Sequence, residues 1–380
     1  MDRIFGGDVF LLQKGKEKSS AVWYNRNCQE NKNTIQGRTV SMQSIAELHE
    51  ENKLEVIQGT GEILSDVADN GRKRPWDKHK KASQKLAELF VSARELEKNL
   101  ISDSRLQALS ECGSFLFFDR NIEQKLRLNR ANFCRVRLCP MCSWRKSLKL
   151  FGQVSRIVDE LLNQQPTTRF IFVTLTVPNC KADRLTKVMN DINKAFSYLT
   201  NINKTFAPAK RFKENLLGYM KAMEVTYNQR TDTYHPHIHC LFAIKSAYFS
   251  NDGYITKSEW QGIWSQAMNS NRELIVHVET IKNSTSKAVA EMSKYPVKPT
   301  DVLKIRNKNK AVIALTVLHS ALRNRRLVTF GGLMAEIKRA LNLEDVDASN
   351  ADLIHVDSEK PFVPVEQVLY RWCKIGAYVC

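Results

Sequence analysis

The sequence predicts an α+β fold with a central antiparallel β-sheet flanked by helices. Two observations support this prediction. Strand-like segments with a period of two alternate with longer helical segments, and a short polar turn joins two of the strands. Strands linked by both a hairpin and helices favour an antiparallel sheet. Strands are expected at 169–177, 217–227, 234–244 and 274–281, and helices at 143–162, 181–199, 255–268 and 284–295.

The chain has 380 residues, of which 43% are hydrophobic, enough for one large or two modest domains. Changes in composition suggest four regions. We expect a charged, partly disordered or helical N-terminal region at 1–100 and a cysteine-rich segment at 101–165. The sheet domain is expected at 166–305 and a helical C-terminal region at 306–380.

The balance of charges points to a polyanionic partner. Lysine and arginine exceed aspartate and glutamate by a formal net charge of +18. Nucleic acid is the simplest such partner, and an anionic membrane surface is the alternative. No run approaches the roughly 20 apolar residues of a membrane span, and the N-terminus lacks a secretory segment. We therefore expect a cytosolic protein with no membrane partner.

Four cysteines lie in the segment before the sheet domain. Cys134, Cys139 and Cys142 have C-x4-C-x2-C spacing, and Cys112 lies upstream. Four thiolates at such spacing can form a closed structural zinc site, whereas the alternative is a chance cluster of buried free cysteines. Basic residues in the same segment could contact DNA phosphates or form a solvated face: Arg135, Arg137, Arg145 and Lys146.

The strand at 234–244 carries the strongest candidate for a metal site. Period-two alternation puts His235, His237 and His239 on one face and apolar residues on the other. Two imidazoles at i, i+2 form a half-site for a divalent metal. If the hairpin pairs as expected, Glu224 of the preceding strand lies beside them and completes a His-His-carboxylate set.

The choice of metal and ligands stays open at this level. This donor set suits Mn²⁺ or Mg²⁺, or Zn²⁺ with open positions for substrate. His235 is a rival ligand, and Glu224 could instead be exposed or ion-paired. His277 and Glu279 alternate on one strand face and could approach the metal, although solvated side chains explain them more simply.

A second candidate element follows at 291–298. Glu291 and Tyr295 are i, i+4 on a predicted helix, so carboxylate and phenol are neighbours. Tyrosine can act as a covalent nucleophile when nearby cations stabilise its phenolate, and Lys294 and Lys298 could supply that charge. Pro296 places Tyr295 in the last turn of the helix. The alternative is a half-buried structural tyrosine.

These motifs together resemble the HUH endonucleases, and among them the rolling-circle replication initiators (Rep) of small bacterial plasmids. His237-Ile238-His239 resembles the family's His-hydrophobic-His motif, and Glu291 through Lys298 resembles its nucleophile motif. The Thr-rich strand at 172–179 is similar to its first motif. The cysteine block and, more weakly, Tyr370-Arg371-Trp372 are also similar. The resemblance covers about residues 105–375 and implies an HUH-type sheet with an N-terminal zinc-knuckle-like segment.

The resemblance also implies a mechanism. Tyr295 would attack a phosphodiester in the plasmid double-strand origin, at a single-stranded or hairpin nick site. The products would be a 5′-phosphotyrosine and a 3′-hydroxyl primer, and the enzyme would rejoin the strand at termination. Glu291 would end the cycle by activating water or a second attacking group. The resemblance further implies Mn²⁺ or Mg²⁺ at the nicking site, a host helicase as partner and the bacterial cytoplasm as location; a dimer is compatible with it.

Two alternatives remain at the level of sequence. A conjugative relaxase or a transposase would use the same nicking chemistry, but the cysteine block and the single Tyr–Glu pair argue against either. A non-catalytic, zinc-containing DNA-binding protein would explain the charge and the cysteines. It would leave the histidine strand and the Glu291–Tyr295 pair as coincidences.

Overall fold

The computed structural model describes residues 56–201, 207–250, 253–281, 289–290, 292–293, 296–356 and 361–380. Internal contacts divide the chain into two compact units. Unit 1 comprises Met1–Arg74, Phe115–Arg127 and Val363–Cys380, and unit 2 comprises Pro75–Ser114 and Leu128–Phe362. Each unit is described by itself.

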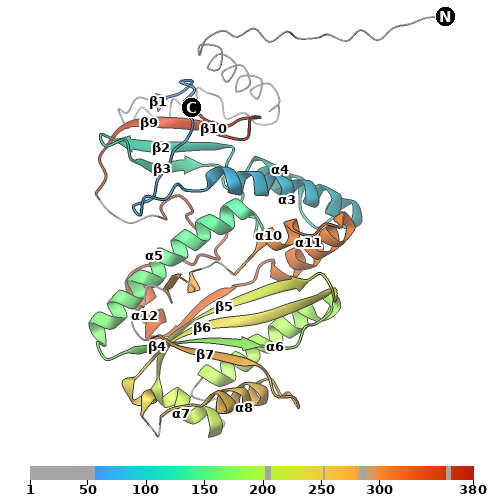
Figure 1. Cartoon of the computed structure of the whole chain (residues 1–380), viewed down its shortest axis with the longest axis vertical. Helices are drawn as coiled ribbons and strands as arrows, with labels where there is room; N and C mark the ends of the chain where they lie inside the picture. Colours follow the sequence, from blue (N-terminus) through green and yellow to red (C-terminus); the bar gives the residue numbers. More distant parts are fainter. Residues whose placement is uncertain are drawn as a thin grey trace, which may run out of the picture. The chain divides into compact units, whose positions relative to one another are not determined.

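Unit 1 is built around a sheet of strands that are distant in sequence. The order is β1 (Val56–Ile57), β9 (Pro364–Trp372), β2 (Phe115–Asn121) and β3 (Leu126–Ala131), and β10 (Tyr378–Val379) also pairs with β9 (Figure 1). Buried cross-strand pairs such as Leu116–Tyr370 form its core. Arg120 forms ion pairs with Glu62 and Glu366 at 2.8 and 2.9 Å. These pairs connect β2 to the segment after β1 and to β9.

Unit 2 contains the five-stranded antiparallel sheet. Its order is β7 (Val276–Ile281), β4 (Arg169–Thr176), β6 (Thr233–Ile244), β5 (Leu216–Asn228) and β8 (Val328–Gly332). Every neighbouring pair in this sheet runs antiparallel. The predicted α+β class, the hairpin and the four predicted strands are therefore confirmed, with bounds that differ by one or two residues.

Phe242 of β6 lies at the centre of the apolar face of this sheet. Three helices cover that face: α6 (Ala182–Thr200), α7 (Ala207–Asn215) and α8 (Lys257–Ala267) (Figure 1). Each contributes a ring within 6.2 Å of that of Phe242, namely Phe196, Phe212 and Trp260. Buried aromatic rings contribute large apolar areas, so this cluster anchors the three helices to the sheet. His235, His237 and His239 of β6 alternate with Phe242 and lie on the other face.

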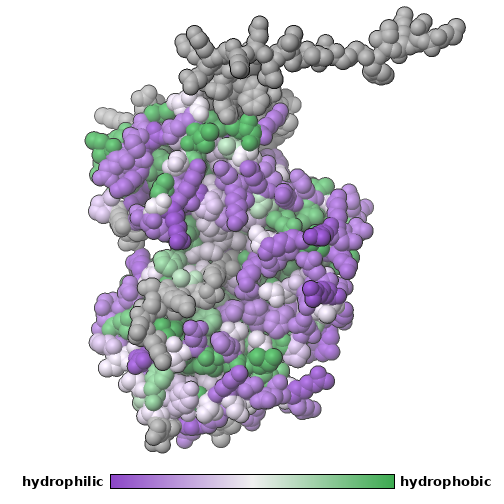
Figure 2. Space-filling model, viewed as in Figure 1, coloured by the Kyte–Doolittle hydropathy of each residue, from purple (hydrophilic) through white to green (hydrophobic). Residues whose placement is uncertain are grey.

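The remaining elements of unit 2 complete its packing. They are α3 (Trp76–Leu96), α4 (Asp103–Glu111), α5 (Pro140–Gln164), the 3₁₀ helix η1 (Ser246–Phe249), α10 (Pro299–Leu303), α11 (Lys308–Leu322) and α12 (Leu333–Ala340). The backbone of α12 comes so close to β5 that a Cβ at Gly218 would lie 2.7 Å from the Met334 nitrogen. Only glycine permits that approach. On the face drawn in Figure 2, hydrophilic side chains surround separate apolar patches, because most large apolar side chains are buried.

The C-terminal region differs from the expected helical region at 306–380. It contains α11 and α12 but also three strands, β8, β9 and β10. Residues 364–372 pair with a strand some 250 positions earlier, and a partner so remote leaves no local signal. Among the described residues, no helix is both long and apolar enough to cross a lipid bilayer.

Candidate functional site

The β5–β6 hairpin positions the metal candidates as a row of cross-strand pairs. Glu224 lies opposite His237, and Ala222 lies opposite His239. Residues paired in this way project from the same face of an antiparallel sheet. The turn between the strands is held by the Asn228 side chain, whose Oδ1 accepts hydrogen bonds from the Arg230 and Thr231 amides at 3.0 and 3.4 Å. Local turn chemistry therefore fixes the register that places the carboxylate beside the imidazoles.

Glu224, His237 and His239 form what we call the His-His-Glu cluster. The Nε2 atoms of His237 and His239 lie 4.0 and 3.6 Å from the Glu224 oxygens, and all candidate ligand atoms lie within 4.8 Å of one another. Ligands of one divalent ion, each about 2.1 Å from it, are separated by comparable distances. The set of two nitrogens and one carboxylate therefore fits a divalent metal.

Hydrogen bonds to the other ring nitrogens orient both imidazoles. The Nδ1–H of His237 donates to the backbone carbonyl of His235 at 3.1 Å, since a carbonyl can only accept. The Nδ1 of His239 lies 3.0 Å from the Thr174 hydroxyl on the adjacent strand β4. The carbonyl therefore fixes the His237 tautomer that leaves its Nε2 lone pair for a metal, and the Thr174 contact holds the His239 ring in place.

Burial and charge set the protonation states in the cluster. Burial lowers the pKa of His237 to about 4, which keeps it neutral near pH 7. Burial alone would raise the pKa of Glu224. Hydrogen bonds from His239 and Lys298 outweigh that effect and lower the pKa to about 2. The cluster therefore presents an ionised carboxylate and a neutral imidazole, as metal ligation requires.

The nucleophile motif is described only in part. Glu291, Lys294 and Tyr295 lie outside the described residues. Lys298, the last residue of that motif, is described, and its Nζ forms an ion pair with Glu224 Oε1. The Lys298 side chain is 47% exposed, whereas that of Glu224 is 7% exposed. The end of the motif therefore contacts the His-His-Glu cluster directly.

The other residues considered as metal ligands lie outside the His-His-Glu cluster. His235 stacks on His237 with ring centroids 5.0 Å apart, but it does not belong to the described group of candidate ligand atoms. His277 lies opposite Thr174, and Glu279 lies opposite Phe172, on the far side of β4. Neither joins the cluster among the described residues.

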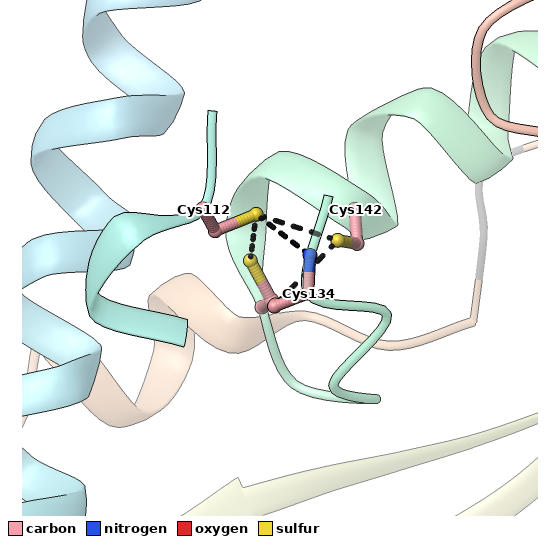
Figure 3. Close-up of side chains that lie close together, drawn as sticks. Cys112, Cys134 and Cys142 are labelled. Carbon is pink, nitrogen blue, oxygen red and sulfur yellow. Dashed lines mark hydrogen bonds between the residues drawn. The ribbon is translucent and has the colours of Figure 1, made fainter. Parts of the chain in front are cut away.

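The four predicted cysteine ligands come together, and we call them the cysteine cluster. Cys112 follows α4, Cys134 and Cys139 precede α5, and Cys142 lies in its first turn. Figure 3 shows the side chains of Cys112, Cys134 and Cys142 converging. Sγ–Sγ distances are 3.6 Å for Cys112–Cys142, 3.7 Å for Cys134–Cys142 and 3.6 Å for Cys139–Cys112. Tetrahedral zinc with Zn–S bonds of about 2.3 Å has S–S edges of about 3.8 Å, so the thiols fit this ion.

Neighbouring groups supply hydrogen bonds to the sulfurs. The Arg135 amide donates to Cys142 Sγ at 3.2 Å, an approach that needs the positive φ of 56° at Arg135. The Ser83 hydroxyl on α3 lies 3.4 Å from Cys139 Sγ. Burial raises the pKa of the Cys112 and Cys134 thiols, so holding them as thiolates requires a neighbouring positive charge.

The structure corrects the predicted DNA contacts of Arg145 and Lys146. The Arg145 side chain is fully buried and donates to the carbonyls of Leu353 and Ile354 at 2.8 and 2.7 Å. Lys146 is only 5% exposed. The sequence showed the charges of both residues but not that α5 turns them inward.

The other two predicted DNA contacts have different surroundings. Arg137 is ion-paired with Asp347 and also donates to the Arg325 carbonyl at 2.6 Å. Its guanidinium is therefore occupied within unit 2. Arg135 is exposed, and its DNA contact stays a prediction.

Two supporting residues escaped the sequence interpretation. Thr174 lies in the Thr-rich strand but was not named as a site residue, and it contacts His239. Ser83 contacts the cysteine cluster from a helix 56 residues away. The Phe172–Thr176 alternation marked the correct face for Thr174, but only the β4–β6 register shows which histidine it meets.

Comparisons with known proteins agree on one kind of relative. A family model described as "Replication protein" matches residues 125–377. The chain is 36% identical over 311 residues to "Protein rep" of Streptococcus pneumoniae serotype 2 (strain D39 / NCTC 7466), covering 80% of this chain and 91% of the relative. It is 34% identical over 324 residues to "Protein rep" of Lactiplantibacillus plantarum, covering 82% and 96%. "Protein rep" of Bacillus amyloliquefaciens is 36% identical over 325 residues, covering 78% and 90%. No solved structure matches the chain.

Proposed function

This chain belongs to the Rep family of plasmid rolling-circle replication initiators, and we propose that it nicks one strand of its plasmid's double-strand origin through a tyrosine nucleophile. The same enzyme would rejoin the strand at termination. The observation that carries this proposal is the His-His-Glu cluster of the β5–β6 hairpin, contacted by the last residue of the nucleophile motif. A histidine pair on the central strand β6 also supports an HUH-type sheet.

Glu224, His237 and His239 would hold the divalent metal, with Mn²⁺ or Mg²⁺ as candidates. When bound, that ion would polarise the scissile phosphate and neutralise charge developing on it. The protein's own contribution is orientation. The carbonyl of His235 and the hydroxyl of Thr174 hold the imidazoles, and the hairpin holds the carboxylate.

Tyr295 would be the nucleophile. Its hydroxyl oxygen bonds to phosphorus while the bond from phosphorus to the 3′ oxygen breaks. The tyrosine gives up one proton, and the released 3′ oxygen takes one up. The phosphotyrosine conserves the energy of the phosphodiester, so the strand can be rejoined without ATP. Glu291 would activate water or a second attacking group to end the cycle.

Lys298 links this chemistry to the described structure. Lys298 is three positions after Tyr295, and three residues span at most about 11 Å. The ion pair of Lys298 with Glu224 therefore keeps the motif close to the His-His-Glu cluster. Lys294 and Lys298 would supply positive charge to the phosphate and the phenolate.

We propose a structural Zn²⁺ in the cysteine cluster. The Sγ–Sγ spacings and the amide–sulfur hydrogen bonds support it. A closed four-thiolate site would connect the end of α4 to the start of α5, with α3 in contact through Ser83. It would contribute to folding rather than to chemistry.

The test of the nicking function is covalent capture. Purified protein is incubated with Mn²⁺ and labelled single-stranded DNA from the plasmid origin, and the products are run on a denaturing gel. We expect a denaturant-resistant adduct that is lost in Tyr295→Phe. Tyr254→Phe, which removes an exposed tyrosine hydroxyl elsewhere in unit 2, should retain it. Full adduct formation by Tyr295→Phe would show that the nucleophile is assigned wrongly. Absence of any adduct from the wild-type protein would favour a non-catalytic DNA-binding protein.

A further inference from the structure

An open cavity of about 760 Å³ lies at the turn end of the β5–β6 hairpin. It is lined by residues 226–230 of the hairpin together with Asn179 and His235. All of these residues belong to unit 2 and lie in the described part of the chain. We call this cavity the hairpin groove.

The groove continues the face that carries the His-His-Glu cluster. Thr226 pairs with His235, and Glu224 pairs with His237 two residues further along the strands. Pairs two residues apart face the same side and are separated by about 7 Å along a strand. His235 belongs to the groove and also stacks on His237, a cluster residue. An extended polymer bound across the His-His-Glu cluster would therefore continue into the hairpin groove.

The walls of the groove are held in place by hydrogen bonds. Asn179 Nδ2 donates to the Thr233 hydroxyl at 3.0 Å, and the Tyr227 hydroxyl donates to Asp232 Oδ1 at 2.7 Å. Lys181 Nζ donates to the carbonyls of Thr231 and Asp232 at 3.1 and 3.2 Å. A surface held in its bound shape loses less conformational entropy when a ligand binds.

The chemistry of the groove matches single-stranded nucleic acid. The Arg230 side chain is exposed, and no ion pair of it is found among the described residues. A free guanidinium is suited to bidentate contact with phosphate. His235 offers a ring for base stacking, whereas Tyr227 pairs with Tyr234 and packs against its ring on the other face of the hairpin. The amides of Asn179 and Gln229 offer donors and acceptors.

One ring nitrogen of His235 has no hydrogen-bond partner in the described part of the chain. Its ring bonds the backbone of Val177, whereas its Nδ1 atom is buried with no hydrogen-bond partner in the described structure. Buried polar atoms are nearly always paired in native proteins. The hydrogen bonding of His235 is therefore incomplete among the described residues.

We propose that the hairpin groove binds the nucleotides adjoining the scissile phosphate on one side of the nick. This inference rests on the proposed nicking function and adds to it a subsite for single-stranded DNA. Arg230 would hold a backbone phosphate, and His235 would support an unstacked base. The hairpin groove would thereby position the scissile phosphate at the His-His-Glu cluster.

Binding without chemistry gives the first test. A fluorescent origin strand, and separately oligo(dT) of 20 nucleotides, is titrated with full-length protein in EDTA. We expect Arg230→Ser to weaken binding about fivefold and to lower the slope of log K against log salt by about 0.7, the value for one phosphate contact on a single strand. Arg230→Lys should retain the slope. Arg272→Ser removes an exposed arginine from the loop before β7 and should bind like wild type.

Photo-crosslinking locates the contact. Origin strands carrying 4-thiothymidine at single positions on either side of the nick are irradiated with the protein, and the crosslinked peptide is identified by mass spectrometry. We expect crosslinks to the 226–235 peptide from positions within about two nucleotides of the nick, on one side only.

Two outcomes would contradict the proposed role of the hairpin groove. Unchanged affinity and salt slope in Arg230→Ser, or crosslinks only to other peptides, would overturn the groove proposal. Neither measurement needs cleavage, so failure of the adduct assay alone would remove the nicking function and leave the groove result interpretable.

Discussion

Replacement of Lys298 by methionine should tighten binding of Mn²⁺ to the protein. In the structure the Lys298 ammonium lies on Glu224 Oε1, one of the oxygens that would ligate the metal. A divalent ion entering the His-His-Glu cluster must therefore displace this cation or bind beside it. Methionine retains most of the side-chain length without the charge.

The magnitude follows from the surroundings of the ion pair. Opposite charges about 4 Å apart interact by about 4 kcal/mol at an effective dielectric constant of about 20. The Lys298 side chain is 47% exposed, so solvent screening reduces the loss to about 1–2 kcal/mol. Since 1.4 kcal/mol is a factor of ten, Mn²⁺ should bind the variant roughly 5- to 30-fold more tightly.

Isothermal titration calorimetry of the DNA-free protein with MnCl₂ measures this effect. Lys304→Met is the matched control, because it removes a lysine from an exposed ion pair with Asp301 near the same short helix. The metal-free Lys298→Met protein should also unfold more easily, and Mn²⁺ should restore its stability. Equal or weaker Mn²⁺ binding by Lys298→Met would refute the competition and show that Lys298 supports the ligand set.

Three further predictions concern other parts of unit 2. Cys139→Ser should lower bound zinc, measured by atomic absorption, from about one ion per chain, whereas Cys180→Ser should not, since Cys180 lies outside the cysteine cluster. Burial lowers the pKa of His319 to about 4, so between pH 6.5 and 4 the unfolded chain binds the proton and the folded chain does not. Acid should therefore remove up to about 3 kcal/mol of stability through this residue. Denaturant titrations should therefore show that His319→Gln loses less stability on acidification than the wild-type protein, by that amount. If the pH dependence of stability is the same in both proteins, the role assigned to His319 is wrong. Arg145→Met should lower the free energy of unfolding by about 2–4 kcal/mol while leaving the salt slope of DNA binding intact; a changed slope would restore Arg145 as a phosphate contact.

Local patterns predicted most of the sheet in unit 2 and its candidate ligands. Alternation in β6 placed His237 and His239 on one face, and the short turn after β5 brought Glu224 to them. Spacing alone grouped the four cysteines. These predictions succeeded because period-two alternation and tight turns are properties of neighbouring residues.

Contacts between distant segments could not be predicted in this way. The pairing of Thr174 with His239 depends on the β4–β6 register, and the inward position of Arg145 depends on a loop some 200 residues later. The strand β9 gave only a weak aromatic signal, because its partners lie far away in the sequence. In each case the deciding interaction joins residues that are too far apart in the sequence for a local pattern to include both.

The sheet of unit 1 has a consequence for the order of folding during synthesis. Its central strand β9 separates β1 from β2, so residues 364–372 must be made before these strands have their neighbour. The five strands of the unit 2 sheet all lie between residues 169 and 332, and they can pair while later residues are still being translated. Domains fold as units as they emerge, and long-range pairing is slow. The unit 2 sheet is therefore expected to assemble on the ribosome first, and the unit 1 sheet to form last.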